Sequence, residues 1–149
     1  MKTTKSKIFA QFISGIFGGT ILGITGFVTM MNYGGNYGCW PFIDSLFGTL
    51  GYESCGSFGL ITGVISGAII AIIILGKIKI SNYPKVSIYL LLGTFILPLI
   101  YGVVMFWPPL EDGDLLIVPP VILGLMVASI IPSVITTGAL NWREFLRRK

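Results

Sequence analysis

The sequence predicts an all-α integral membrane protein: a four-transmembrane-helix bundle with both termini cytoplasmic and a short interfacial helix in the first external loop. Three observations predict this fold. Hydrophobic residues make up 54% of the 149 residues and charged residues only 11%, unlike a soluble domain. Four uncharged stretches each reach the roughly 20 residues that cross a bilayer core. The charged residues gather between these stretches and are sorted by sign.

The four predicted spans cover residues 8–31, 57–76, 86–107 and 115–140. Together they take up most of the chain, so we expect residues 1–149 to form a single four-helix membrane domain. The first apolar run is longer than the ~7–15 residues of a cleavable signal, and no A-x-A-like site follows it. We therefore expect this run to remain as the first span.

The basic residues fall into three groups, located before the first span, between the second and third, and after the fourth: Lys2, Lys5, Lys7; Lys77, Lys79, Lys85; Arg143, Arg147, Arg148, Lys149. Five of the six acids occupy the other two gaps: Asp44, Glu53, Glu111, Asp112, Asp114. Basic residues near span ends stay cytoplasmic, which predicts that both termini are inside. Because these residues flank spans, the net charge of +4 does not indicate a nucleic-acid partner. The basic C-terminal tail has the alternative role of docking a cytoplasmic partner.

Two of the predicted spans carry glycines at four-residue spacing, which places them on one helix face: Gly15, Gly19 and Gly23; Gly59, Gly63 and Gly67. In lipid, small residues let helix backbones approach closely, as in a glycine zipper. One interpretation is that the two faces pack on each other within a hairpin. The alternative is that one face binds a second copy or another subunit.

The gap between the first two spans is rich in turn formers and aromatic residues. Residues 32–38 are expected to form turns, because glycine and asparagine tolerate positive φ. Residues 41–50 are expected to form a short surface helix with Pro41 in its first turn. Its apolar residues would face lipid or the bundle, and Asp44, Ser45 and Thr49 would face water.

Cys39 and Cys55 are the only cysteines, and both lie in this gap. On the predicted topology they face an oxidising compartment, where a disulfide between them would stabilise the loop by ~3 kcal/mol. Free thiols and a redox-active pair are the alternatives. There is no C-x-x-C motif, and no family resemblance is indicated.

Catalytic and cofactor-binding groups are scarce in this sequence. The chain has no histidine, which excludes His-ligated haem and His-based triads, and the cysteines and acids have no metal-ligand spacing. We therefore expect neither an enzyme nor a cofactor or metal site. The predicted spans contain no Asp, Glu, Lys or Arg, which disfavours proton relays and ion paths.

Pro98 and Pro132 interrupt the third and fourth spans, and each is expected to kink its helix. The hydroxyls around Pro132 form the best candidate for a polar seam or lining: Ser129, Ser133, Thr136 and Thr137. Most other hydroxyls in the spans are expected to bond back to their own helix.

These features favour a non-catalytic accessory or structural subunit that packs into a larger membrane complex. The alternatives are a small oligomeric channel or carrier for a neutral solute, and an external thiol-redox protein. The expected partners are the lipid bilayer and other membrane subunits or further copies of the chain. The expected location is the plasma membrane or another energy-transducing membrane.

Overall fold

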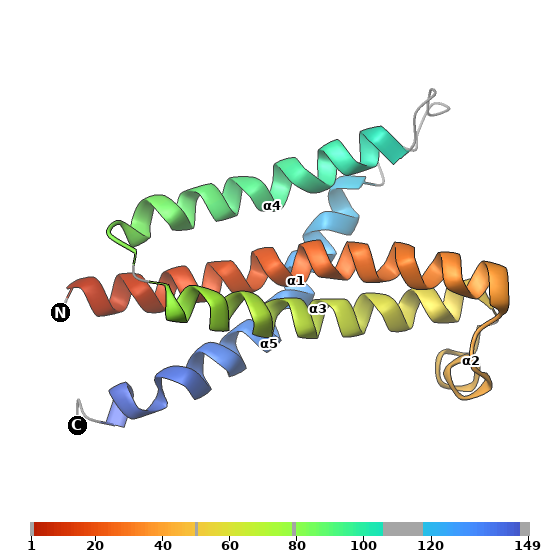
Figure 1. Ribbon diagram of the computed structural model, residues 1–149, viewed down its shortest axis with the longest axis horizontal. Coiled ribbons are helices and arrows are strands. Elements are labelled where there is room, and N and C mark those ends of the chain that lie inside the picture. Colours follow the sequence, from red (N-terminus) through yellow and green to blue (C-terminus); the bar gives the residue numbers. More distant parts are fainter. Residues whose placement is uncertain (1, 50, 79, 106–117, 147–149) are drawn as a thin grey trace.

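The computed structural model describes residues 2–49, 51–78, 80–105 and 118–146, and in these ranges the chain forms five α-helices (Figure 1). Their bounds are α1 Lys2–Tyr37, α2 Pro41–Phe47, α3 Tyr52–Lys77, α4 Tyr83–Met105 and α5 Val118–Leu146. The four long helices α1, α3, α4 and α5 are apolar and long enough to cross a membrane. The prediction of an all-helical chain with four potential spans is therefore confirmed.

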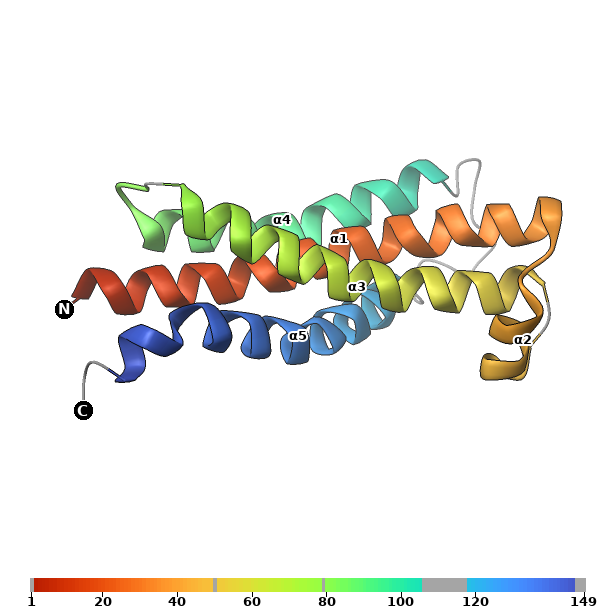
Figure 2. The same cartoon turned by 60° about the horizontal axis from the view of Figure 1, so that its bottom comes forward.

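Helix α1 lies at the centre of the arrangement and packs against α3, α4 and α5. The α1–α3 contact is the most extensive, and these two helices run antiparallel along the long axis (Figure 1). Helices α4 and α5 lie on opposite sides of α1 (Figure 2), and α5 crosses it obliquely (Figure 1). The core therefore follows α1, whose residues between Ala10 and Ile16 are buried except for Phe12.

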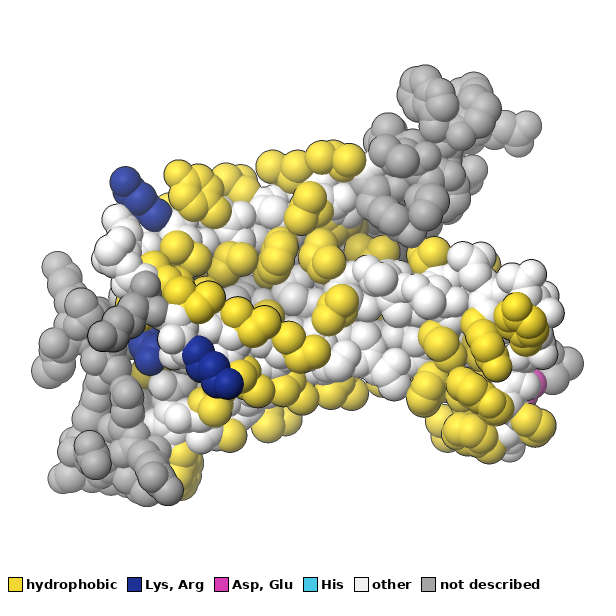
Figure 3. Space-filling view, viewed as in Figure 1, with side chains coloured by type: hydrophobic (Ala, Val, Ile, Leu, Met, Phe, Trp, Pro, Cys, Tyr) yellow, Lys and Arg dark blue, Asp and Glu magenta, His cyan; other side chains and the backbone are white. Residues whose placement is uncertain are grey.

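Charged side chains lie at the two ends of the bundle. The first turns of α1 and α4 and the last turns of α3 and α5 share one end, and α2 lies at the other (Figure 1). Among the described side chains, the first end carries only basic residues and the second only acidic ones (Figure 3): Lys5, Lys7, Lys77 and Lys85; Asp44 and Glu53. A long apolar surface separates the two ends.

Helix α1 is longer than predicted, because residues 32–37 continue the helix instead of forming turns. Gly34 is buried against the start of α3, where an added Cβ would lie 2.8 Å from Cys55 Cβ and 2.9 Å from Tyr52 Cα. Close packing on α3 thus outweighs the low helix propensity of glycine. The helix ends only at Gly38, whose φ of 77° is left-handed and whose N–H bonds to the Gly34 carbonyl at 2.9 Å.

The short helix α2 begins at Pro41 and ends before Gly48, which adopts a φ of 67° and donates its N–H to the Asp44 carbonyl at 2.9 Å. Proline in the first turn and glycine after the last are both favourable positions. Pro98 and Pro132 lie inside α4 and α5. The predicted ends of the third and fourth spans at 106–107 and 115–117 lie outside the described residues.

Candidate functional site

Glycines line the contact between α1 and α3. A Cβ added at Gly18 would lie 2.5 Å from the Gly67 carbonyl oxygen, and one added at Gly67 would overlap the Gly18 carbonyl oxygen. Gly26 and Gly59 oppose each other in the same way, in the register of an antiparallel pair. Only glycine permits this approach, at which van der Waals contacts and weak Cα–H···O bonds add up.

Gly63 completes this stripe on α3, because a Cβ there would overlap the Leu22 carbonyl oxygen and lie 3.0 Å from Gly23 Cα. The glycines of α3 thus meet a face of α1 made by Gly18, Leu22 and Gly26. Sequence spacing alone did not single out Gly18 and Gly26, because Leu22 interrupts their stripe.

The predicted glycine stripe of α1 lies between α5 and α3. A Cβ at Gly19 would lie 2.6 Å from Ser129 Oγ of α5 and 3.1 Å from the Val64 carbonyl oxygen of α3. One at Gly15 would overlap Ser133 Oγ and lie 2.7 Å from Ile72 Cδ1. One at Gly23 would be 2.7 Å from Val64 Cγ2 and 3.6 Å from Leu125 Cδ2. The two predicted glycine stripes therefore meet only in part, at Gly23 and Gly63. As the central helix, α1 needs one small face for each neighbour.

A polar seam on α5 faces α1 and is buried along its length. It consists of four residues at four-residue spacing: Ser129, Ser133, Thr137 and Asn141. Three of these were candidates from the sequence, whereas Thr136 is only half-buried and lies beside the stripe. The seam runs from the middle of α5 toward the end of the bundle that carries the lysines (Figure 2).

Two carboxamides close the seam near that end. Asn141 Nδ2 donates to Gln11 Oε1 at 3.0 Å and to the Thr137 carbonyl oxygen at 2.9 Å. Gln11 and Asn141 are 3% and 6% exposed, so this hydrogen bond links α1 to α5 inside the bundle. Sequence reasoning missed both residues. Asn141 could have been found from the sequence, because it continues the four-residue spacing of Ser129, Ser133 and Thr137.

Most buried hydroxyls of the spans are satisfied by their own helix. The hydroxyls of Ser14, Thr20, Ser87, Thr94 and Ser129 each donate to a backbone carbonyl three or four residues earlier. Ser133 Oγ and Thr137 Oγ1 are buried and have no hydrogen-bond partner among the described residues. These two hydroxyls are therefore the exceptional polar groups of the seam.

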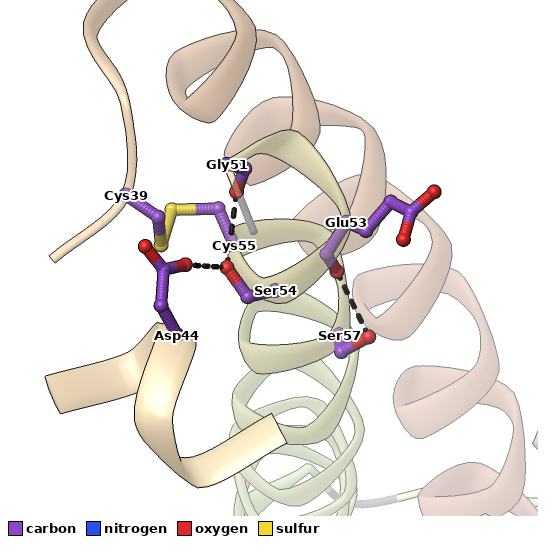
Figure 4. Close-up of a disulfide and its surroundings, with 7 residues drawn as sticks. All are labelled: Cys39, Asp44, Gly51, Glu53, Ser54, Cys55 and Ser57. Atoms are coloured by element: carbon purple, nitrogen blue, oxygen red, sulfur yellow. Dashed lines mark hydrogen bonds between the residues drawn. A yellow bond between two sulfur atoms is a disulfide. The ribbon is translucent and has the colours of Figure 1, made fainter. Parts of the chain in front are cut away.

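A disulfide joins Cys39, just after α1, to Cys55 in the first turn of α3, with the two Cα atoms 5.6 Å apart (Figure 4). The hydroxyl of Ser54 donates to the carboxylate of Asp44 and also lies 3.0 Å from the Gly51 carbonyl oxygen. Asp44 therefore turns toward α3, whereas the sequence predicted that it faces water. Ser54 is fully buried, and a carboxylate acceptor supplies the stronger, charge-assisted bond for its hydroxyl.

The outer surface of this cap is apolar and aromatic. Phe42 and Leu46 project from α2 and are 65% and 71% exposed, while Ile43 between them is fully buried. The rings of Tyr37 and Trp40 both stack on Tyr33, with centroid separations of 5.3 and 5.5 Å. The space-filling view shows these apolar side chains gathered around α2 (Figure 3). The cap thus turns the half-buried Asp44 toward α3 and displays hydrophobic residues at its surface.

Comparisons with protein-family models, with curated proteins and with solved structures found no match.

Proposed function

We propose that this chain is a non-catalytic accessory or structural subunit that packs into a larger membrane complex. The observation that carries the proposal is the surface of α4. This helix has the smallest buried share of the four spans, 17% against 44% for α1. Its buried residues are Ser87, Thr94 and Pro98, and Gly93 is set against the ring of Phe17 of α1.

The opposite face of α4 displays large apolar side chains: Ile88, Leu92, Phe95, Ile96 and Leu99. Lipid alone satisfies such a face, but a span with so little contact to its own chain gains stability from a neighbouring helix. By contrast, the small-residue faces of α1 are occupied by α3 and α5. The exposed face of α4 is therefore the surface that we assign to a partner subunit.

Site-specific photo-crosslinking in native membranes tests this assignment. A photoreactive residue at Leu92 or Ile96 should crosslink to one defined protein, which a pull-down in mild detergent should also recover. The matched control is Ile65, which is 47% exposed on α3 and should react only with lipid. Recovery as a lone monomer in several mild detergents, without a protein crosslink at either α4 position, would refute the proposal.

For the topology, we propose that both termini are cytoplasmic and that the membrane is the plasma membrane or another energy-transducing membrane. The four lysines at one end of the bundle support the orientation through the preference of basic span ends for the cytoplasm. On this topology α2 lies at the outer interface. Its exposed Phe42 and Leu46, with Trp40 beside them, suit the headgroup boundary.

The polar seam favours a second candidate function, a small oligomeric channel or carrier for a neutral solute. Its hydroxyls and carboxamides carry no charge, so the seam itself offers no charged group to an ion. Flux through proteoliposomes tests this candidate. If the chain is such a channel or carrier, proteoliposomes should take up a neutral solute faster than empty vesicles. The variant Ser133→Leu, whose larger side chain fills the seam, should abolish this uptake. Uptake at the level of empty vesicles for a panel of neutral solutes would reject it.

A further inference from the structure

The strongest unexplained feature of the molecule is the pair of unpartnered hydroxyls in the polar seam. Ser133 and Thr137 are 0% and 6% exposed, and neither hydroxyl finds a partner among the residues described. One turn earlier on the same helix, Ser129 Oγ donates to the Leu125 carbonyl at 2.7 Å. The difference shows that the two orphan hydroxyls are turned away from their own backbone.

Both orphan hydroxyls belong to the contact with α1. Ser133 Oγ points at Gly15, where the missing side chain leaves space for it. Gly19 pairs with Ser129 and Gly15 with Ser133, which sets an antiparallel register between α1 and α5. This register places Thr137 level with Gln11, next to the bond between Gln11 and Asn141.

The carboxamide pair brings further polar atoms to the same place. Both N–H groups of Asn141 are used, one on Gln11 Oε1 and one on the Thr137 carbonyl. Gln11 Nε2 lies beside Gly76 of α3, where an added Cβ would be 2.8 Å away. Two hydroxyls and two carboxamides from α1 and α5 thus belong to the same contact between these helices.

We propose that this cluster, formed by Gln11, Ser133, Thr137 and Asn141, binds water between α1 and α5. A buried polar group without a partner is unfavourable, and a bound water relieves this by bonding to two to four such groups. The ligand must be small, because glycines on α1 hold the helices close together. The four side chains of the cluster carry no charge, which suits a neutral ligand.

The cluster lies toward the C-terminal end of α5, because Asn141 is its last member along that helix. From there the polar side chains continue along α5 to Ser129. The carboxamide bond closes the seam at this end, so the water is held inside the bundle between Asn141 and Ser133. This inference does not depend on the chain being an accessory subunit.

Water-edited solid-state NMR of the full chain in liposomes tests the proposal. With labelled serine and threonine, magnetisation from water should reach Thr137 and Ser133 several-fold faster than it reaches Thr20 and Thr94. These two controls are fully buried as well, but each donates to its own helix. Transfer to Thr137 and Ser133 that is as slow as transfer to both controls would overturn the proposal.

A pair of conservative variants tests the cluster itself. Thr137→Val keeps the side-chain shape but removes the hydroxyl, so transfer from water to Gln11 and Ser133 should slow several-fold. The matched control Thr94→Val should leave that transfer unchanged. Unchanged transfer in Thr137→Val would place the water elsewhere and refute the assignment. If this variant does not fold, the comparison within the native chain still decides the question.

Discussion

Gly26 shows how one missing Cβ sets the distance between two helices. A Cβ at this position would overlap the Gly59 carbonyl oxygen, which is backbone and cannot rotate away. We expect Gly26→Ala to lower the free energy of unfolding by about 1–3 kcal/mol, the usual cost of overpacking. The measurement is reversible unfolding of the chain in bicelles by steric trapping.

The control for this prediction is Gly124→Ala on α5, where nothing lies within 4 Å of an added Cβ. Alanine is the better helix former by up to about 1 kcal/mol, so this variant should be neutral or slightly stabilising. Equal destabilisation by the two variants would show that the contact between α1 and α3 is looser than described.

Gln11 and Asn141 form a buried hydrogen bond between helices whose energy can be isolated. Hydrogen bonds between membrane helices average about 0.6 kcal/mol and reach about 1.7 kcal/mol. We expect a double-mutant cycle of Gln11→Leu and Asn141→Leu to give a favourable coupling in that range. A cycle of Gln11→Leu with Thr94→Val on α4 should be additive. Additivity in the first cycle as well would contradict the 3.0 Å bond.

At the scale of elements, the cap that contains α2 depends on one covalent link and few contacts. Cys39 and Cys55 are 16 residues apart, and closing a loop of this size stabilises a fold by ~3 kcal/mol. We expect Cys39→Ala/Cys55→Ala to raise amide hydrogen exchange in α2 strongly. Exchange in the middle of α1 and α3 should stay slow, because their glycine contact lies elsewhere. Unchanged protection of α2 would mean that Ile43 and the bond between Asp44 and Ser54 hold the cap alone.

The long helices were predictable from the sequence because each is a long uncharged run, and in lipid such a run must satisfy its backbone internally as a helix. The extension of α1 to Tyr37 was not predictable. Gly34 and Gly35 disfavour a helix locally, and the compensation comes from α3, which packs against Gly34. Local propensity therefore failed where a tertiary contact decides.

The residues of the seam were partly predictable for a related reason. Periodicity placed Ser129 and Ser133 on one face of a helix, but it carries no information on the neighbour of that face. The same limit applies to the glycines of α1, where the spacing revealed a small face without showing that it packs on α5. The hydroxyls of Ser133 and Thr137 lack a hydrogen-bond partner because of their rotamers and their neighbours on other helices. Neither can be predicted from the spacing of residues in the sequence.

At the scale of the whole molecule, the sorting of charge links the fold to its orientation. Each of the four spans is long and apolar enough to cross one bilayer. The described lysines and acids lie at opposite ends of the bundle (Figure 3). The cap with the disulfide belongs to the acidic end, and the closed end of the polar seam belongs to the basic end. Each proposal about the cap, the seam and the partner face thus depends on which end faces the cytoplasm.

Cysteine labelling of sealed cells tests that orientation directly. Cys39 and Cys55 are joined and do not react with maleimides, so single cysteines can be added to the native chain. Lys85 and Ser45 are both exposed and lie at opposite ends. We expect a membrane-impermeant maleimide to label Ser45→Cys in intact cells and Lys85→Cys only after permeabilisation, because basic span ends stay inside. Labelling of Lys85→Cys from outside would invert the topology. It would place the disulfide in the cytoplasm, where thiols are kept reduced, and move the closed end of the polar seam to the external face.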